Sequence, residues 1–246
     1  MKKQVGKSHL FTFVGALILL GIHGVRNHRK VWSTVRAQVF YSLRDLLTCQ
    51  LFELIGTFIH VVTPAEDAAS GNPLRKLQPL IDHIKNKCFE FYQPQKEISI
   101  DERMKSKARC HFKQYMRNKP TKWGFKLWVL ADMTGYTVDF NIYTGKSTDK
   151  SDSGLAHDVV MQLVPPFVFQ GYQLYCDNFY SSPVLFEDLH QLRIMATGTF
   201  RSNRWELPDE VVSLKTALEK GNVPWGTGYY IHDKKTDIVY CAWKDK

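Results

Sequence analysis

The chain has 246 residues, enough for one large domain or two modest ones with a substantial core. Apolar residues make up 44%, charged residues 23% and aromatic residues 13% of it, which excludes a disordered chain, a collagen and a disulfide-stapled miniprotein. Nine of its 33 basic residues lie in the segment from Arg103 to Lys126, which contains no acidic residue. The other 24 basic residues equal the 24 acidic residues in number, so the net charge of +9 comes from this one segment.

The N-terminal segment imitates a signal peptide, because three lysines precede the apolar run Leu10–Ile22. At 13 residues this run is too short for a transmembrane helix, which needs about 20. No small-x-small cleavage site follows it. A buried helix with Gly15 and Gly21 at close-packing positions accounts for the run equally well. Secretion stays open as the alternative, and we expect no membrane partner.

Two further segments predict helices. Residues 34–62 and 74–88 carry apolar residues at the three- and four-residue spacings of one helical face. A polar connector with glycine and proline, residues 66–73, separates them. We therefore expect an all-helical N-terminal region over residues 1–95, of the kind that serves dimerisation or DNA binding.

After residue 95 the apolar pattern changes from a helical to an alternating period. Strands are predicted at residues 97–101, 125–131, 138–143, 172–176 and 194–200, and as a terminal hairpin at 228–231 and 238–243. A helix is predicted at 157–164, and a second begins at Pro183 after the N-cap Ser182. This order matches an α/β, ribonuclease-H-like core with a mixed sheet over residues 96–200, followed by residues 201–246.

Two aspartates come together in that arrangement. Asp101 ends the first predicted strand and Asp177 follows the fourth, and these strands are neighbours in a ribonuclease-H-like sheet. Carboxylates on rigid strands suit a hard cation such as Mg²⁺, and paired ions about 3.5–4 Å apart support phosphodiester chemistry. The alternative is that both are turn or cap residues, which spacing alone favours.

The basic segment predicts a polyanionic partner, most commonly nucleic acid. Its candidate DNA-binding residues are Lys105, Lys107, Arg109, Lys113, Arg117, Lys119, Lys122 and Lys126. A solvated basic face is the alternative. Trp123 lies among these residues, and we expect it to pack in the core rather than to stack on a base.

Five motifs in order resemble the piggyBac transposase family. They are Phe58–Pro64, Ile98–Met104, Gln114–Trp128, Gly135–Lys146 and Cys176–Ser182. The resemblance implies that Asp101 and Asp177 are the first two aspartates of the catalytic Asp-Asp-Asp set and that they hold Mg²⁺ or Mn²⁺. It also implies that the basic segment faces DNA and that residues 201–246 begin a β-rich insertion.

The sequence departs from the family pattern at both ends. The family's third aspartate lies on a helix beyond the β-rich insertion, and nothing in this sequence matches it or the zinc module that follows. We therefore expect a chain truncated at both ends, with an incomplete ribonuclease-H-like core and no zinc module. Glu102, Asp132 and Asp209 are the acidic residues to consider if another acid completes the site.

Three functions follow from these observations. We expect a transposable element-derived nuclear protein that binds DNA and is catalytically inactive, since the third aspartate is absent. An active piggyBac-type transposase and strand-transfer nuclease is the first alternative. A protein-interaction module that pairs with a longer family member is the second. The expected partners are DNA and either a second copy of the chain or a longer family member.

Overall fold

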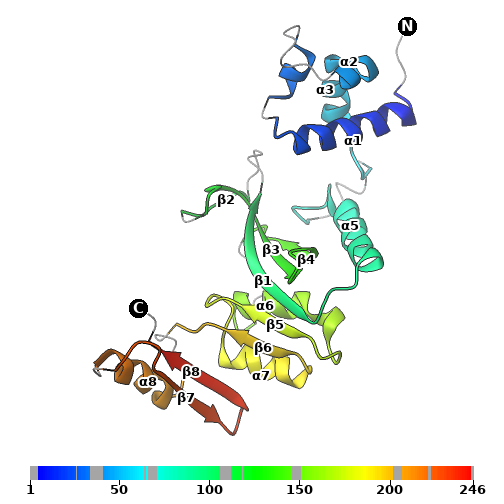
Figure 1. The fold of residues 1–246 in the computed structure, drawn as a ribbon. Coiled ribbons are helices and arrows are strands. Elements are labelled where there is room, and N and C mark those ends of the chain that lie inside the picture. The colour runs from blue at the N-terminus through cyan, green and yellow to red at the C-terminus, as the bar shows by residue number, and fades with distance from the viewer. Residues whose placement is uncertain are drawn as a thin grey trace. The chain divides into compact units, whose positions relative to one another are not determined.

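The structure, a computed structural model, describes residues 5–25, 27–33, 41–63, 65, 71–105, 112–117, 119–145, 151–201, 207–220 and 223–244. The chain divides into two compact units, Met1–Pro79 and Leu80–Lys246, whose elements are labelled in Figure 1. Among the predicted DNA-binding residues, Lys107 and Arg109 lie outside the described residues, and only the backbone of Lys105 is described.

Short helices build the first unit. They are α1 (Lys7–Ile22), the 3-10 helix η1 (His28–Trp32), α2 (Tyr41–Leu46) and α3 (Cys49–Phe58). Phe52 of α3 occupies their small core, with its ring centroid 5.0 Å from that of Phe13 and 5.2 Å from that of Trp32. Thr48 caps α3 by accepting a hydrogen bond from the backbone N–H of Leu51.

Helix α1 forms where the apolar run predicts it, but it is not a buried helix. Phe13 and Ala16 are its buried residues, whereas Ile22 is 74% exposed. A Cβ added to Gly15 or Gly21 would meet no atom within 4 Å among the described residues. The prediction of close packing at these two glycines is therefore wrong.

A mixed sheet is the framework of the second unit. Its strands are β1 (Glu97–Lys105), β2 (Gln114–Tyr115), β3 (Trp123–Asp132), β4 (Thr137–Ile142), β5 (Gln173–Cys176) and β6 (Met195–Gly198). Their order is β2-β3-β1-β5-β6, and β4 pairs with β3. β1 runs parallel to β5, with Ile100 opposite Cys176. The predicted ribonuclease-H-like neighbours are thus confirmed.

Three helices pack on this sheet: α5 (Gln78–Phe91), α6 (Leu155–Leu163) and α7 (Pro183–Gln191). Val160 of α6 and Leu185 of α7 are fully buried with Leu174 of β5 in one hydrophobic core. Ser182 caps α7 by accepting a hydrogen bond from the N–H of Leu185 at 3.1 Å, and Pro183 takes the first helical position. This helix start agrees with the prediction.

The unit boundary at Pro79 falls inside the region predicted to be helical over residues 1–95. α5, which begins at that boundary, packs within the second unit, as two of its contacts show. Lys85 forms an ion pair of 2.9 Å with Asp139 of β4. The rings of Phe89 and Phe167 lie 6.0 Å apart between centroids. α5 therefore belongs structurally with the sheet.

β1 is longer than the prediction of residues 97–101. Its antiparallel pairing with β3 continues to Lys105, opposite Phe125. Its parallel pairing with β5 ends at Ile100. Asp101 is therefore not the end of a strand, as expected, but the first β1 residue beyond the edge of β5. Beyond Ile100, β1 no longer pairs with β5, and the carboxylates meet at this position.

A helix and a hairpin follow the sheet: α8 (Asp209–Lys220), β7 (Gly228–Asp233) and β8 (Ile238–Trp243). The hairpin agrees with the prediction, whereas α8 was not predicted. Ile238 and Tyr240 form a small buried cluster against Val211 of α8 and Phe186 of α7. The part assigned to the start of a β insertion therefore includes a helix that packs on the hairpin.

No helix among the described residues is long and apolar enough to cross a bilayer. Of the five cysteines, Cys110 lies outside the described residues, and no disulfide joins the other four within the part of the chain that the structure describes: Cys49, Cys88, Cys176 and Cys241.

Candidate metal and nucleic-acid site

Three carboxylates meet where β1 passes the end of β5. One oxygen from each of Asp101, Glu102 and Asp177 lies within 4.8 Å of the others. Asp101 is exposed, with 69% of its side chain accessible to solvent, whereas only 10% of the Glu102 side chain is accessible. The structure therefore brings together the two predicted aspartates and adds a glutamate, and we call these three residues the acidic cluster.

A tight turn holds Asp177 in place. Its Oδ1 accepts a hydrogen bond from the N–H of Phe179 at 2.9 Å, and its carbonyl accepts one from the hydroxyl of Ser181 at 2.9 Å. The alternative role as a turn residue is therefore real, but it leaves the second carboxylate oxygen for another ligand. Gly198 of β6 backs the turn, because a Cβ there would lie 2.8 Å from the carbonyl of Cys176.

Glu102 is held by a lysine from the neighbouring strand. Lys126 of β3 places its Nζ 3.3 Å from Oε1 of Glu102, and 15% of its side chain is exposed. In the β1–β3 register Glu102 lies opposite Trp128, so Lys126 is its diagonal neighbour on the same face. The Lys126 ammonium also lies 5.5 Å from the Trp128 ring centre and 5.0 Å from that of Phe179.

A second lysine reaches the acidic cluster from the basic segment. Lys119 donates a hydrogen bond of 3.0 Å to the carbonyl of Glu102 and lies 3.7 Å from Oδ1 of Asp101. Two ammonium groups therefore face three carboxylates. Lys119 therefore links the basic segment to the acidic cluster.

Tyr180 is a site residue that the sequence does not identify. It is 1% exposed, and its hydroxyl has no hydrogen-bond partner among the described residues. Burial raises the pKa of Tyr180, and the negative charges of Glu102 and Asp101 raise it further. The hydroxyl thus stays protonated beside the carboxylates and is ready to donate a hydrogen bond to an oxygen bound there.

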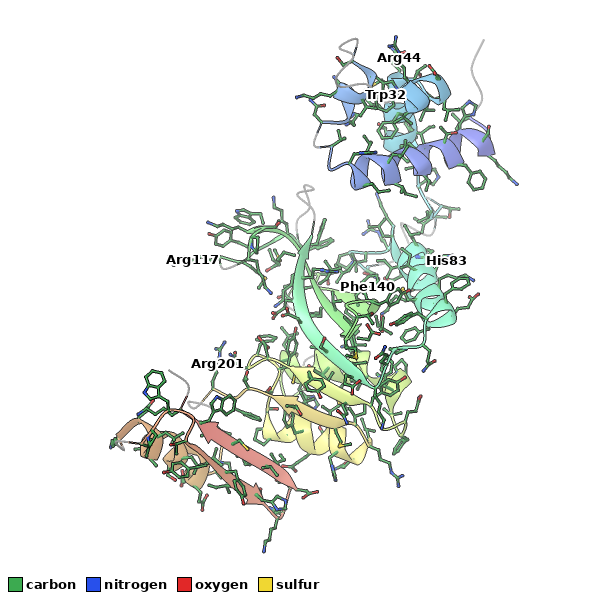
Figure 2. The ribbon with its side chains drawn as sticks, viewed as in Figure 1. Trp32, Arg44, His83, Arg117, Phe140 and Arg201 are labelled. Atoms are coloured by element: carbon green, nitrogen blue, oxygen red, sulfur yellow. The ribbon has the colours of Figure 1, made fainter. Side chains whose placement is uncertain are left out.

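Arg103 and Lys105 of the basic segment lie on β1, and its remaining described members lie in and beside the β2–β3 hairpin. Arg117 and Lys122 are exposed, and Figure 2 shows Arg117 at the outer end of β2. The Lys113 ammonium lies 5.4 Å from the ring centre of Trp123. Trp123 is 52% exposed and contacts Tyr115 with 5.0 Å between centroids. The expectation that Trp123 packs in the core is therefore wrong.

Arg201 adds a positive charge that the sequence does not single out. It follows β6, is exposed, and donates a hydrogen bond of 2.9 Å from Nε to Oδ1 of Asn178, next to Asp177 (Figure 2). No charge run marks this residue. Only the position of β6 beside β5 brings it to the Asp177 turn.

Asp132, named as a reserve ligand, serves a different purpose. It lies at the other end of β3, opposite Ile98 of β1, and is 3% exposed. Its carboxylate accepts hydrogen bonds from the Tyr92 hydroxyl and from the hydroxyl and N–H of Thr134. These bonds tie α5 to the β3–β4 turn. Asp209 begins α8 and is not part of the acidic cluster.

Comparisons with known proteins show what the chain is similar to. The family model described as Transposase IS4 matches residues 1–246. PiggyBac transposable element-derived protein 3 of Homo sapiens is 30% identical over 243 residues, which are 95% of this chain and 39% of that protein. PiggyBac transposable element-derived protein 2 of Homo sapiens is 30% identical over 247 residues, covering 94% of this chain and 39% of that protein. The chain thus spans about two fifths of these relatives.

The fold resembles a solved structure described as a piggyBac transposase synaptic complex with hairpin DNA. The TM-score is 0.77, and the match covers 97% of this chain and 52% of the other. The sequences are 20% identical, so this likeness concerns the fold. A ribonuclease-H-like sheet that gathers acidic residues at the end of β5 is common to the sequence prediction and the structure.

Proposed function

The chain belongs to the piggyBac-type transposase family, and from this premise we propose that it is a nuclear DNA-binding protein whose 246 residues alone do not cut DNA. One observation carries the proposal. Lys119 connects the basic segment to the acidic cluster, through bonds to the carbonyl of Glu102 and the carboxylate of Asp101. A DNA backbone that followed the exposed basic side chains would reach the carboxylates, and the solved relative is described as a complex with DNA.

A divalent cation suits the acidic cluster. Carboxylate oxygens are the ligands that Mg²⁺ and Mn²⁺ prefer, and Asp101 and Asp177 are the proposed ligands. The buried, unpartnered hydroxyl of Tyr180 supports a polar occupant, because buried polar groups almost always have a partner. When bound, such an ion would polarise a phosphate oxygen.

The arrangement of the described residues supports binding without cleavage. Glu102 is already paired with Lys126, and Asp101 is approached by Lys119. No further acidic side chain joins the acidic cluster in the part of the chain that the structure describes. A two-metal clamp needs more ligands than Asp101 and Asp177 provide.

Salt-dependent binding to duplex DNA tests the proposal. Replacing Lys113, Arg117, Lys119 and Lys122 with Ala should weaken binding to any duplex and flatten the salt slope by about one unit for each phosphate that the variant no longer binds. The matched control replaces four exposed lysines elsewhere in the second unit, Lys96, Lys220, Lys234 and Lys235, and should bind nearly as the parent does. Equally weakened binding in both variants would mean that the net charge, and not the basic segment, attracts DNA.

The helical unit supports a second candidate function, as an interaction module. Ile18 and Phe11 on α1 are 58% and 79% exposed, an apolar surface of the kind found where proteins associate. A second copy of the chain or a longer family member is the proposed partner. Replacing both residues with Gln should abolish self-association in light-scattering measurements and leave DNA binding intact. Unchanged self-association would contradict this role.

A further inference from the structure

The positively charged ammonium group of Lys126 lies against the acidic cluster. Lys126 reaches 3.3 Å from Oε1 of Glu102, and the two side chains are only 15% and 10% exposed. Aromatic rings of Trp128 and Phe179 lie near the ammonium group. These interactions fix a positive charge within the cluster, whereas Arg117 and Lys122 of the same hairpin are exposed to solvent.

The second unit offers a matched pair for comparison. Lys85 and Asp139 lie 2.9 Å apart, with 24% and 7% of their side chains exposed. The chemistry and burial are close to those of Lys126 and Glu102. The difference lies in the neighbours, because Asp139 joins no group of three potential ligands among the described residues, whereas Glu102 does.

We infer that Lys126 is a resident counter-cation that occupies the Glu102 side of the acidic cluster and competes there with a divalent metal ion. Its charge repels the incoming ion, and its bond to Glu102 removes one carboxylate from the ligand set. The parent chain therefore binds Mg²⁺ or Mn²⁺ weakly, through Asp101 and Asp177. The inference deepens the proposed function and rests on its metal site.

The hydroxyl of Tyr180 is independent support for an exchangeable occupant. It is buried and has no partner among the described residues, although Asp101, Glu102 and Asp177 lie near enough to influence it. A buried donor without a partner is costly. A hydrated cation between the carboxylates would give it a water or carboxylate oxygen to bond. An ammonium group has no acceptor, so Lys126 cannot accept a hydrogen bond from this O–H, whereas an oxygen held by a cation could.

Mn²⁺ binding to Lys126→Met, measured as free Mn²⁺ by electron paramagnetic resonance, tests the inference. Removing the charge should tighten Mn²⁺ binding about tenfold. The same variant should unfold at a lower temperature in chelator and regain its stability when Mn²⁺ is added. Lys85→Met is the matched control, which should be destabilised in the same way and should not respond to Mn²⁺. Lys126→Gln, which keeps a hydrogen-bond donor, covers the case that Lys126→Met does not fold.

The outcomes separate the two proposals. Tighter Mn²⁺ binding in both Lys126 variants supports the inference, even if the parent shows no measurable binding. Measurable binding by the parent that the variants leave unchanged or weaken overturns the inference alone. Absence of binding in the parent and both variants overturns the inference together with the proposed metal site. Undiminished DNA binding by the variant of Lys113, Arg117, Lys119 and Lys122 would contradict the proposed function and leave this inference unaffected.

Discussion

The paired strands β1 and β3 place carboxylates in opposite situations. At the end of β3 Asp132 is buried, and its oxygens accept hydrogen bonds from Tyr92 and Thr134. Three residues further along the pairing, opposite Val129, Asp101 of β1 is 69% exposed beside two further carboxylates. The carboxylate of Asp132 has its hydrogen-bond donors within the protein, whereas that of Asp101 lies beside two further negative charges.

This difference distinguishes structural acids from functional ones. An acid that receives several hydrogen bonds stabilises the fold, and its removal leaves the donors without partners. Acids that share a small volume repel one another, and they are maintained at the expense of stability when a ligand needs them. The partners of each carboxylate, and not its position on a strand, indicate its role.

Replacing each of the two aspartates gives the largest expected contrast. Asp132→Ala should reduce the free energy of unfolding by about 2–3 kcal/mol, because buried donors are left without their acceptor. Asp101→Ala should change it by less than about 0.5 kcal/mol or increase it, because repulsion is relieved. Urea unfolding of both variants measures the difference. Equal destabilisation would contradict the comparison.

Two tyrosines extend the comparison to a smaller effect. Tyr92→Phe removes the hydroxyl that donates to Asp132 and should reduce the free energy of unfolding, by less than Asp132→Ala does. Tyr180→Phe removes a hydroxyl with no partner in the described structure, so it should change stability by less than about 0.5 kcal/mol. Strong destabilisation by Tyr180→Phe would mean that this hydroxyl is bonded in the metal-free protein.

The smallest expected difference concerns how the stability of the parent and of an Asp132 variant depends on pH. Burial alone raises the pKa of Asp132, but hydrogen bonds from Thr134, Tyr92 and Tyr136 outweigh it and hold the pKa below its usual range. A carboxyl with a lowered pKa in the folded state stabilises the protein above its unfolded pKa of about 3.9, and this contribution disappears as the pH falls through the folded value.

The parent should therefore become less stable on acidification below about pH 4 more steeply than Asp132→Asn does. Urea midpoints measured through this range give both curves. Parallel curves for the parent and Asp132→Asn would show that Asp132 does not contribute to the acid sensitivity.

Most of the fold could be predicted from the sequence, because local periodicity marks its elements. The alternation around Ile98 and Ile100 and the N-cap at Ser182 have direct local causes. α8 was missed even though Val211, Leu214 and Leu218 repeat at helical spacing. The end of β1 was misplaced for a different reason, since its last residues pair only with β3, and pairing depends on the register of distant residues.

The site could be predicted only in part. Asp101 and Asp177 follow from the motifs and from the neighbouring strands that they flank. The pairing of Glu102 with Lys126 depends on the β1–β3 register, which no spacing in the sequence reveals. The sequence does not mark Tyr180 as a site residue, because an aromatic residue after a turn is also typical of a hydrophobic core. Its role emerges from the missing partner of its hydroxyl among the described residues.

A combined binding and cleavage assay tests most directly whether the chain binds DNA without cutting it. The purified chain is incubated with Mg²⁺ or Mn²⁺ and a duplex that carries piggyBac-type ends with TTAA flanks, beside an Asp101→Ala control. We expect salt-dependent binding by both proteins, with no nicked or joined product from either. Products formed by the parent and absent from the control would contradict the proposal, and would mean that a further acid, with Glu102 the first to examine, completes the site.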